Sequence, residues 1–301
     1  FADEIEKLAS EDRRIVLLSG DIGNRMFDTF KDKFPDSFYN CGVAEANMTG
    51  MAAGMALCGL RPVTYTITAF NTARVLEQIR LDVCYQNLPV IIVGVGGGLS
   101  YASLNATHHA LEDIAFLRVL PNMTVICPGD AWEVRAAIKA AIKINGPVYI
   151  RMGKKGEPLV HKSLPNLKIG EGLLVKEGSD ICILNSGCLL PTAIQVAEDL
   201  QEKGISTQVV SMHTVKPLDE TLLKKTFNKF SHVFTLEEHS ILGGFGGSVA
   251  EWLSDNQGLK ANLKRLGTRD EFMTEAGEQD HARKFFGISR ESILKEILKE
   301  V

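Results

Sequence analysis

The sequence predicts an α/β protein made of two doubly wound domains, and three features support this fold class. Short runs rich in valine and isoleucine alternate with segments of helical period, as in parallel sheets covered by helices. The chain has 301 residues, of which 45% are hydrophobic, and is longer than a typical domain with a single hydrophobic core. A polar stretch with two prolines, Met152 to Leu167, interrupts the alternation near the middle of the chain.

The first half predicts a parallel sheet with helical crossovers. Its apolar runs of strand length are Ile15–Ser19, Pro62–Ile67, Val90–Val95, Thr124–Cys127 and Val148–Arg151. The segments of helical period between them are Glu45–Leu57, Ala73–Tyr85, Leu111–Leu117 and Trp132–Ile144. We therefore expect a first domain at residues 1–155 and a linker at residues 156–172.

The second half repeats the alternation without repeating the sequence, so it predicts a distinct domain at residues 173–301. Its expected strands are Ile181–Ser186, Thr207–Met212, Val233–Leu236 and Leu263–Leu266. Its expected helices are Pro191–Lys203, Asp219–Phe227, Gly247–Asp255 and Glu291–Glu300.

Composition argues against several classes of function. The formal net charge is -4, and the basic residues are scattered among acids, so the chain has no positively charged surface that would attract the phosphates of a nucleic acid. Its longest apolar runs are too short to span a membrane. The cysteines form no C-x-x-C pair and lie mostly in apolar runs, so we expect buried thiols in a reducing, cytoplasmic compartment. They are Cys41, Cys58, Cys84, Cys127, Cys182 and Cys188.

Glu45 is the main candidate for chemistry, because it opens a helix otherwise made of small and apolar residues. The ordinary explanation for an acidic residue at this position is structural, because a negative charge in the first turn interacts favourably with the helix dipole. Against that explanation, Gly50 and Gly54 would let another group approach the helix and leave Glu45 in apolar surroundings. A carboxyl there would have a raised pKa and could act as a proton donor.

The segment Gly42-Val-Ala-Glu45-Ala-Asn-Met48 resembles the glutamate motif of the transketolase family of thiamine enzymes. Other segments resemble the same family, in family order over nearly the whole chain. They are Ser19-Gly-Asp-Ile22, Arg61-Pro-Val-Thr-Tyr-Thr-Ile-Thr-Ala-Phe70, Leu76-Glu-Gln-Ile-Arg80, Thr107-His-His-Ala-Leu-Glu-Asp-Ile-Ala115, Leu120-Pro-Asn-Met-Thr-Val125, Gly146-Pro-Val-Tyr-Ile-Arg151, Val215-Lys-Pro-Leu-Asp219 and Glu237-Glu-His-Ser-Ile-Leu-Gly-Gly-Phe-Gly-Gly247. The resemblance implies a thiamine pyrimidine-binding domain followed by a transketolase C-terminal-like domain.

The resemblance also implies roles for three residues. The family glutamate hydrogen-bonds the pyrimidine of thiamine diphosphate and favours the imino tautomer that removes the thiazolium C2 proton, so Glu45 would be catalytic. Phe70 and Ile67 would hold the pyrimidine, although core packing is the alternative for Phe70. Ile67 stands where the family often has phenylalanine, and Ala73 replaces an aromatic residue of the usual pocket wall.

The family motif for the diphosphate and Mg²⁺, a Gly-Asp-Gly with a downstream asparagine, is absent from this sequence. Gly20-Asp21-Ile22 and Gly129-Asp130-Ala131 lack its third glycine, and no cluster of oxygen ligands stands out. We expect no metal ligands in this chain. The resemblance implies a partner, the N-terminal transketolase subunit, which would bind Mg²⁺ in an α2β2 heterotetramer.

Substrate recognition is expected to depart from the family pattern. Leu104 stands where an aspartate reads a substrate hydroxyl, and leucine accepts no hydrogen bond. A family histidine before this turn is replaced by glycine within Val95-Gly96-Gly97-Gly98. His108 matches a histidine near the substrate, although a histidine at a helix start is the alternative. Arg151 matches a position near the substrate phosphate and equally suits an ion pair with an acid. Arg25 is a weaker candidate.

The resemblance therefore implies one subunit of an enzyme that moves a two-carbon ketol unit from a sugar or sugar phosphate to an aldehyde. The alternatives are an enzyme like deoxyxylulose-phosphate synthase or like the β subunit of a 2-oxoacid dehydrogenase, and a non-catalytic structural subunit. For His239 and the glycines that follow it, a structural strand-to-helix turn is expected rather than a catalytic or phosphate-binding role.

Overall fold

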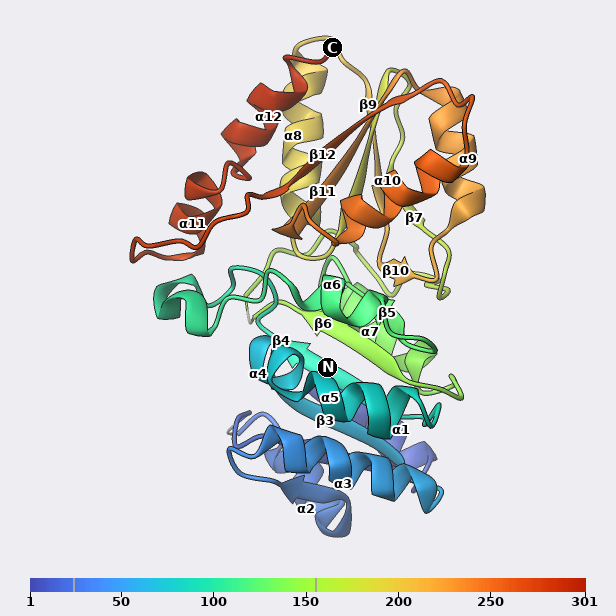
Figure 1. Ribbon diagram of the computed structural model, residues 1–301, viewed down its shortest axis with the longest axis vertical. Helices are drawn as coiled ribbons and strands as arrows, with labels where there is room; N and C mark the ends of the chain where they lie inside the picture. The colour runs from blue at the N-terminus through green and yellow to red at the C-terminus, as the bar shows by residue number, and fades with distance from the viewer. Residues whose placement is uncertain (24, 155) are drawn as a thin grey trace.

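The computed structural model describes residues 1–23, 25–154 and 156–301 of the chain. Figure 1 shows two layered halves stacked along the long axis, each with a sheet covered by helices. The predicted α/β class is confirmed. Lys155, the expected end of the first domain, lies outside the described residues. None of the described helices is long and apolar enough to cross a membrane.

The first sheet has seven strands, and all neighbouring strands are parallel except for one edge strand. In order across the sheet they are β10 (Thr214–Lys216), β5 (Thr124–Ile126), β6 (Val148–Met152), β4 (Ile91–Val95), β3 (Arg61–Ile67), β1 (Ile15–Ser19) and β2 (Phe38–Asn40). The three-residue edge strands β2 and β10 carry too short an apolar pattern to be predicted. Strand β10 comes from the second half, so the segment expected to belong wholly to the second domain completes the first sheet.

Helices cover both faces of this sheet because side chains alternate along each strand. Ile15 and Leu17 face one helical layer, whereas Val16 and Leu18 face the other. The first layer contains α1 (Ala2–Glu11), α2 (Asp28–Lys33) and α7 (Ala131–Ala141). The second contains α3 (Glu45–Leu57), α5 (Leu76–Gln78) and α6 (Asp113–Arg118), with α4 (Thr68–Asn71) at the end of β3.

The predicted helical stretch Ala73–Tyr85 is helical up to Cys84, but it is not one regular α-helix. A 3₁₀ turn at Ala73–Val75 leads into α5 and then into a π-helical segment at Ile79–Cys84. The buried residues Val75, Ile79 and Val83 recur every four positions. A π-helix is wider than an α-helix, so it keeps residues four apart on the buried face.

The second sheet has five strands, of which only β7 runs antiparallel to its neighbour. In order they are β12 (Asn262–Thr268), β11 (His232–Ser240), β8 (Ile181–Ser186), β9 (Thr207–Ser211) and β7 (Leu173–Lys176). Its helices are α8 (Leu190–Glu202), α9 (Glu220–Lys229), α10 (Phe245–Asp255), α11 (Gln279–Phe285) and α12 (Arg290–Ile297). Strand β11 continues four residues past the predicted end at Leu236, through charged residues that find buried partners.

A buried polar cluster joins the two halves. Arg151 on β6 donates from Nε to the Asp113 carboxylate at 2.8 Å, and Tyr149 donates to the same carboxylate at 2.6 Å. Arg151 also donates from Nη2 to the carbonyl oxygens of Ala110 and Glu238, the latter on β11 of the second half. The side chains of Arg151 and Asp113 are only 3% and 1% exposed, so this ion pair is fully desolvated.

Two glycines allow the chain to approach this cluster. A Cβ at Gly97 would lie 2.8 Å from the Arg151 side chain, and one at Gly98 would lie 2.5 Å from the Glu238 carboxylate. Gly98 also has a φ of +69°, which disfavours any residue with a side chain. The glycine run that replaces the expected family histidine therefore has a packing role.

We predict that Arg151→Met lowers the free energy of unfolding by about 3–5 kcal/mol, because the Asp113 carboxylate stays buried without its cation. Urea denaturation of the chain measures this change. Arg14→Met is the matched control, since Arg14 pairs with Asp12 at the surface, where water screens the charges, and its loss should change stability far less. Equal losses in the two variants would contradict the role assigned to Arg151.

Candidate functional site

Glu45 begins helix α3, and two loops fix the start of that helix. Gly42 has a φ of +68°, and its N–H donates to the Asn40 side chain at 2.9 Å. The Asn40 amide group in turn donates to Asp21 in the loop after β1. Glu45 itself is 2% exposed, so the helix holds a carboxylate inside the protein at the carboxyl edge of the first sheet.

The sequence predicted apolar surroundings for Glu45. In the structure, however, a cationic side chain contacts its carboxylate. Arg74 donates from Nη1 to Glu45 Oε2 at 2.8 Å. The same guanidinium lies over the Phe70 ring, with 4.1 Å between Cζ and the ring centroid. Sequence reasoning missed Arg74. Its only signal was a basic residue four positions after Phe70.

Phe70 and His108 form the neighbouring wall. Their ring centroids are 5.1 Å apart in an edge-to-face arrangement, and both side chains are half-buried. Desolvation, together with the charges of His109 and Arg74, lowers the pKa of His108. The structure therefore brings Glu45, Phe70 and His108 into one group, with Arg74 between the first two.

A cavity of about 460 Å³ adjoins this group. Phe70, Arg74 and Thr107 line it from the first half, and Phe272 lines it from the loop between β12 and α11 of the second half. Phe272 is 75% exposed although it sits at this cavity. The second half thus contributes to the wall of the site, which the sequence analysis did not anticipate.

Ile67 lies apart from this group. It packs on the α1 side of the first sheet together with Tyr65, because residues two apart on β3 share a face. There it lines a different cavity, of about 710 Å³, with Phe1 and Tyr101.

The remaining predicted substrate residues are dispersed. Leu104 is 50% exposed on a 3₁₀ segment, Ala102–Thr107, and not enclosed in a pocket. Arg25 is exposed on a backbone with a φ of +66°. Arg151 is buried and bonded to an acid and two carbonyls, which favours the ion-pair alternative over contact with a substrate phosphate.

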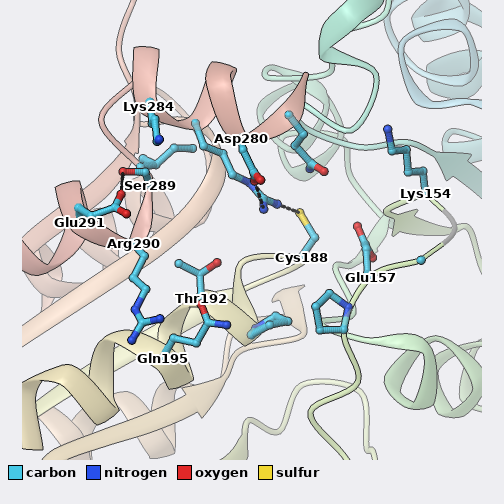
Figure 2. Close-up of a pocket in the computed structure, with 16 residues that line it drawn as sticks. Lys154, Glu157, Cys188, Thr192, Gln195, Asp280, Lys284, Ser289, Arg290 and Glu291 are labelled. Carbon is cyan, nitrogen blue, oxygen red and sulfur yellow. Dashed lines mark hydrogen bonds and ion pairs between the residues drawn. The ribbon is translucent and has the colours of Figure 1, made fainter. Parts of the chain in front are cut away.

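Another hollow, of about 550 Å³, is lined by none of the predicted site residues. Figure 2 shows its lining side chains. Lys154 and Glu157 border it from the segment after β6, facing Thr192 of α8 and Arg290 of α12. Burial raises the pKa of the Glu157 carboxyl to about 7. The lining carries both signs of charge, so it does not select an anion or a cation.

His239 and the glycines after it have a structural role, although His239 lies on β11 and not in a turn. The N–H groups of Phe245 and Gly246 donate to the Glu237 carboxylate at 2.7 and 2.8 Å. Because Glu237 occupies these donors, the glycine turn offers them to no phosphate. His239 Nδ1 donates to the Ser240 carbonyl, and Nε2 accepts from the Ala115 N–H, as a neutral ring requires.

Among the described residues, no group of three or more histidine, cysteine, aspartate or glutamate side chains is arranged to hold a metal ion. The expectation of buried thiols is wrong for Cys58, which is exposed at the end of α3, and Cys41 is only half-buried. The remaining four cysteines are buried.

Comparison with known proteins assigns the class of the molecule. The model "Transketolase, pyrimidine binding domain" matches residues 1–157, and "Transketolase, C-terminal domain" matches residues 170–293. The chain therefore combines a pyrimidine-binding domain with a C-terminal domain of the transketolase type. It belongs to the transketolase family.

Individual relatives agree with this assignment. A putative transketolase C-terminal section from Methanocaldococcus jannaschii is 36% identical over 100% of this chain and 95% of its own length. A 1-deoxy-D-xylulose-5-phosphate synthase from Geobacter sulfurreducens is 35% identical over 97% of this chain, which spans 46% of that enzyme. A solved split-gene transketolase, in an inactive β4 tetramer, is 34% identical with a TM-score of 0.90, covering 99% of this chain and 95% of that one.

We predict that His239 makes stability sensitive to acid. Burial lowers its pKa to about 4, whereas an unfolded histidine titrates near 6.5. As the pH falls, the unfolded chain therefore takes up the proton first. The contribution of His239 to the free energy of unfolding is present above about pH 6.5 and is lost as the pH falls toward 4. The unfolding free energy of the protein should fall by about 1–2 kcal/mol relative to His239→Gln between pH 7 and pH 5.

Urea denaturation at several pH values measures this difference. His281→Gln, at an exposed position, is the control for the replacement of a histidine by glutamine, and it is measured over the same pH range. A gap to His239→Gln that does not change with pH would refute the assignment.

Proposed function

We propose that this chain is the subunit of a split, thiamine-diphosphate-dependent transketolase that supplies the activating glutamate. The complete enzyme would move a two-carbon ketol unit from a ketose to an aldehyde acceptor. One observation carries the proposal: the buried Glu45 shares Arg74 with the Phe70 ring, which also contacts His108, in a sequence without the diphosphate and metal motif. Similarity to a transketolase C-terminal section and to a split-gene transketolase supports it.

The residues present suit a pyrimidine ring. A buried carboxylate and an aromatic face lie close enough for one planar group to contact both, since the Arg74 guanidinium does so. Glu45 Oε2 would hold the proton shared with a ring nitrogen, and Phe70 would orient the ring by contact with its face. Thiamine diphosphate supplies the carbanion chemistry when bound. Mg²⁺ and the diphosphate would be held by the partner chain.

The other predicted site residues differ in how directly they would contact the substrate or the cofactor. His108 would contact the substrate, because its half-buried ring borders the group around Glu45. Leu104 and Arg25 are surface residues of this chain and would reach substrate only where the partner chain covers them. Arg151 is proposed as structural. Ile67 would contribute to the pocket only indirectly, from the other face of the sheet.

We further propose that the chain assembles with an N-terminal subunit as an α2β2 heterotetramer in the cytoplasm. The domain division would be residues 1–155, a linker at 156–172, and residues 173–301. The β4 assembly of the split-gene relative, which is inactive, is consistent with a subunit that needs a partner for activity.

A deoxyxylulose-phosphate synthase activity is the second candidate, because a relative with that activity is 35% identical to this chain. That chemistry begins with a 2-oxoacid and releases carbon dioxide, whereas ketol transfer releases none. The two candidates are therefore separable by their products.

We predict that the free chain shows no turnover and no submicromolar binding of thiamine diphosphate with Mg²⁺. Addition of the N-terminal partner should restore ketol transfer between a ketose phosphate and an aldehyde without release of carbon dioxide. Isothermal titration and product analysis by mass spectrometry measure both. Submicromolar binding by the free chain would exclude the split site, and carbon dioxide release from pyruvate would favour the synthase.

We predict that Glu45→Gln, combined with the partner, lowers turnover by at least about 10²–10⁴-fold, because the amide cannot take up the proton. Assembly, measured by size-exclusion chromatography, should be unchanged. Glu77→Gln is the matched control, since Glu77 is exposed on the neighbouring α5 and should retain full turnover. Activity of Glu45→Gln within a few-fold of the unmodified complex would refute the assignment.

A further inference from the structure

Arg74 makes the two contacts that the proposed pyrimidine ring would need. Its Nη1 donates to Glu45 Oε2 at 2.8 Å, and its Cζ lies 4.1 Å from the centroid of the Phe70 ring. A guanidinium is flat and carries its N–H donors in the plane, so it can stack on an aromatic face while it donates to a carboxylate. An aminopyrimidine is also flat, with polar atoms in its plane.

Where Arg74 covers one face of the Phe70 ring and bonds Glu45 Oε2, a pyrimidine ring cannot make the same two contacts at the same time. We infer that Arg74 occupies the place of the pyrimidine in the free subunit and is displaced when the cofactor binds. This inference rests on the proposed function, since it takes Glu45 and Phe70 as the residues that hold the ring.

The two partners in the ion pair differ in their freedom to move. The Glu45 side chain is 2% exposed on a regular helix, whereas the Arg74 side chain is 45% exposed and borders the cavity of about 460 Å³. Arg74 lies in the 3₁₀ turn Ala73–Val75, between a break at Thr72 and α5. The bond to Glu45 is its one side-chain hydrogen bond within the described part of the chain. The carboxylate is therefore the fixed partner and the guanidinium the movable one.

This contact would have two opposing effects. It neutralises a buried carboxylate, which would otherwise destabilise the free subunit. It also competes with the cofactor for Glu45. The apparent affinity for the cofactor is therefore reduced to the fraction of molecules in which the contact between Arg74 and Glu45 is open. Removing the guanidinium should therefore destabilise the free chain and strengthen cofactor binding. A residue with a purely structural role would not produce the second effect.

The first experiment uses the free chain in a double-mutant cycle. Arg74→Met keeps an unbranched apolar stem against Phe70 and removes the charge. We expect it to lower the folding equilibrium constant of the protein about ten- to a hundred-fold, but to have little effect in a Glu45→Gln background. Arg80→Met, an exposed arginine of the same segment, is the control and should change stability little in either background. Absence of coupling between positions 45 and 74 would overturn the inference.

The second experiment measures the dissociation constant of thiamine diphosphate with Mg²⁺ by isothermal titration, for the chain combined with its N-terminal partner. Arg74→Met should bind about ten- to a hundred-fold more tightly than the unmodified complex, because the competing group is gone. Arg74→Lys should fall between them, since an ammonium lacks the flat fork. Equal or weaker binding by Arg74→Met would overturn the inference and leave the proposed function intact. Failure of the unmodified complex to bind thiamine diphosphate would overturn both.

Discussion

The structure depends on one buried ion pair, between Arg151 and Asp113, at the point where the two halves meet. Both side chains are shielded from water. Asp113 Oδ2 accepts from Tyr149 and Arg151, and Arg151 also donates to the carbonyl oxygens of Ala110 and Glu238. Removal of one partner would leave the other charge desolvated, so the two sheets, α6 and β11 must keep their relative positions. This geometry constrains elements distant in sequence more tightly than apolar packing alone does, because hydrogen bonds are directional.

The segment that carries His108 is held by the same junction. Gly98 and Ala110 exchange backbone hydrogen bonds at 3.0 Å and close this segment into a loop. Arg151 holds the Ala110 end, and the Glu238 carboxylate accepts from the N–H of Leu99 at the other end. The second half therefore positions a wall of the site, both through this loop and through Phe272. The second half can control the shape of the site in this way.

The sequence predicted the regular elements better than the polar contacts. Most strands of four or more residues and the helix after Glu45 follow from the alternation of apolar runs and helical periods, since these patterns record which residues face a core. The helical stretch 73–85 was predicted, but its division into 3₁₀, α and π turns was not, because a repeat of four buried residues fits both an α-helix and a π-helix over a short span. The end of β11 was missed because Glu237, Glu238 and His239 appear unsuited to a buried strand until their partners are known.

By itself, the sequence determined the α/β class, the two-part organisation, and the resemblance that singled out Glu45, Phe70 and His108. Only the tertiary structure decided which charges meet. It placed Arg74 on Glu45, paired Arg151 with Asp113 where the two halves meet, which was one of its two expected roles, and put Ile67 on the α1 side of the first sheet. The physical reason is that periodicity encodes the burial of apolar surface, which depends on local spacing. The pairing of charges depends on distances between segments far apart in the chain, and no local pattern specifies those distances.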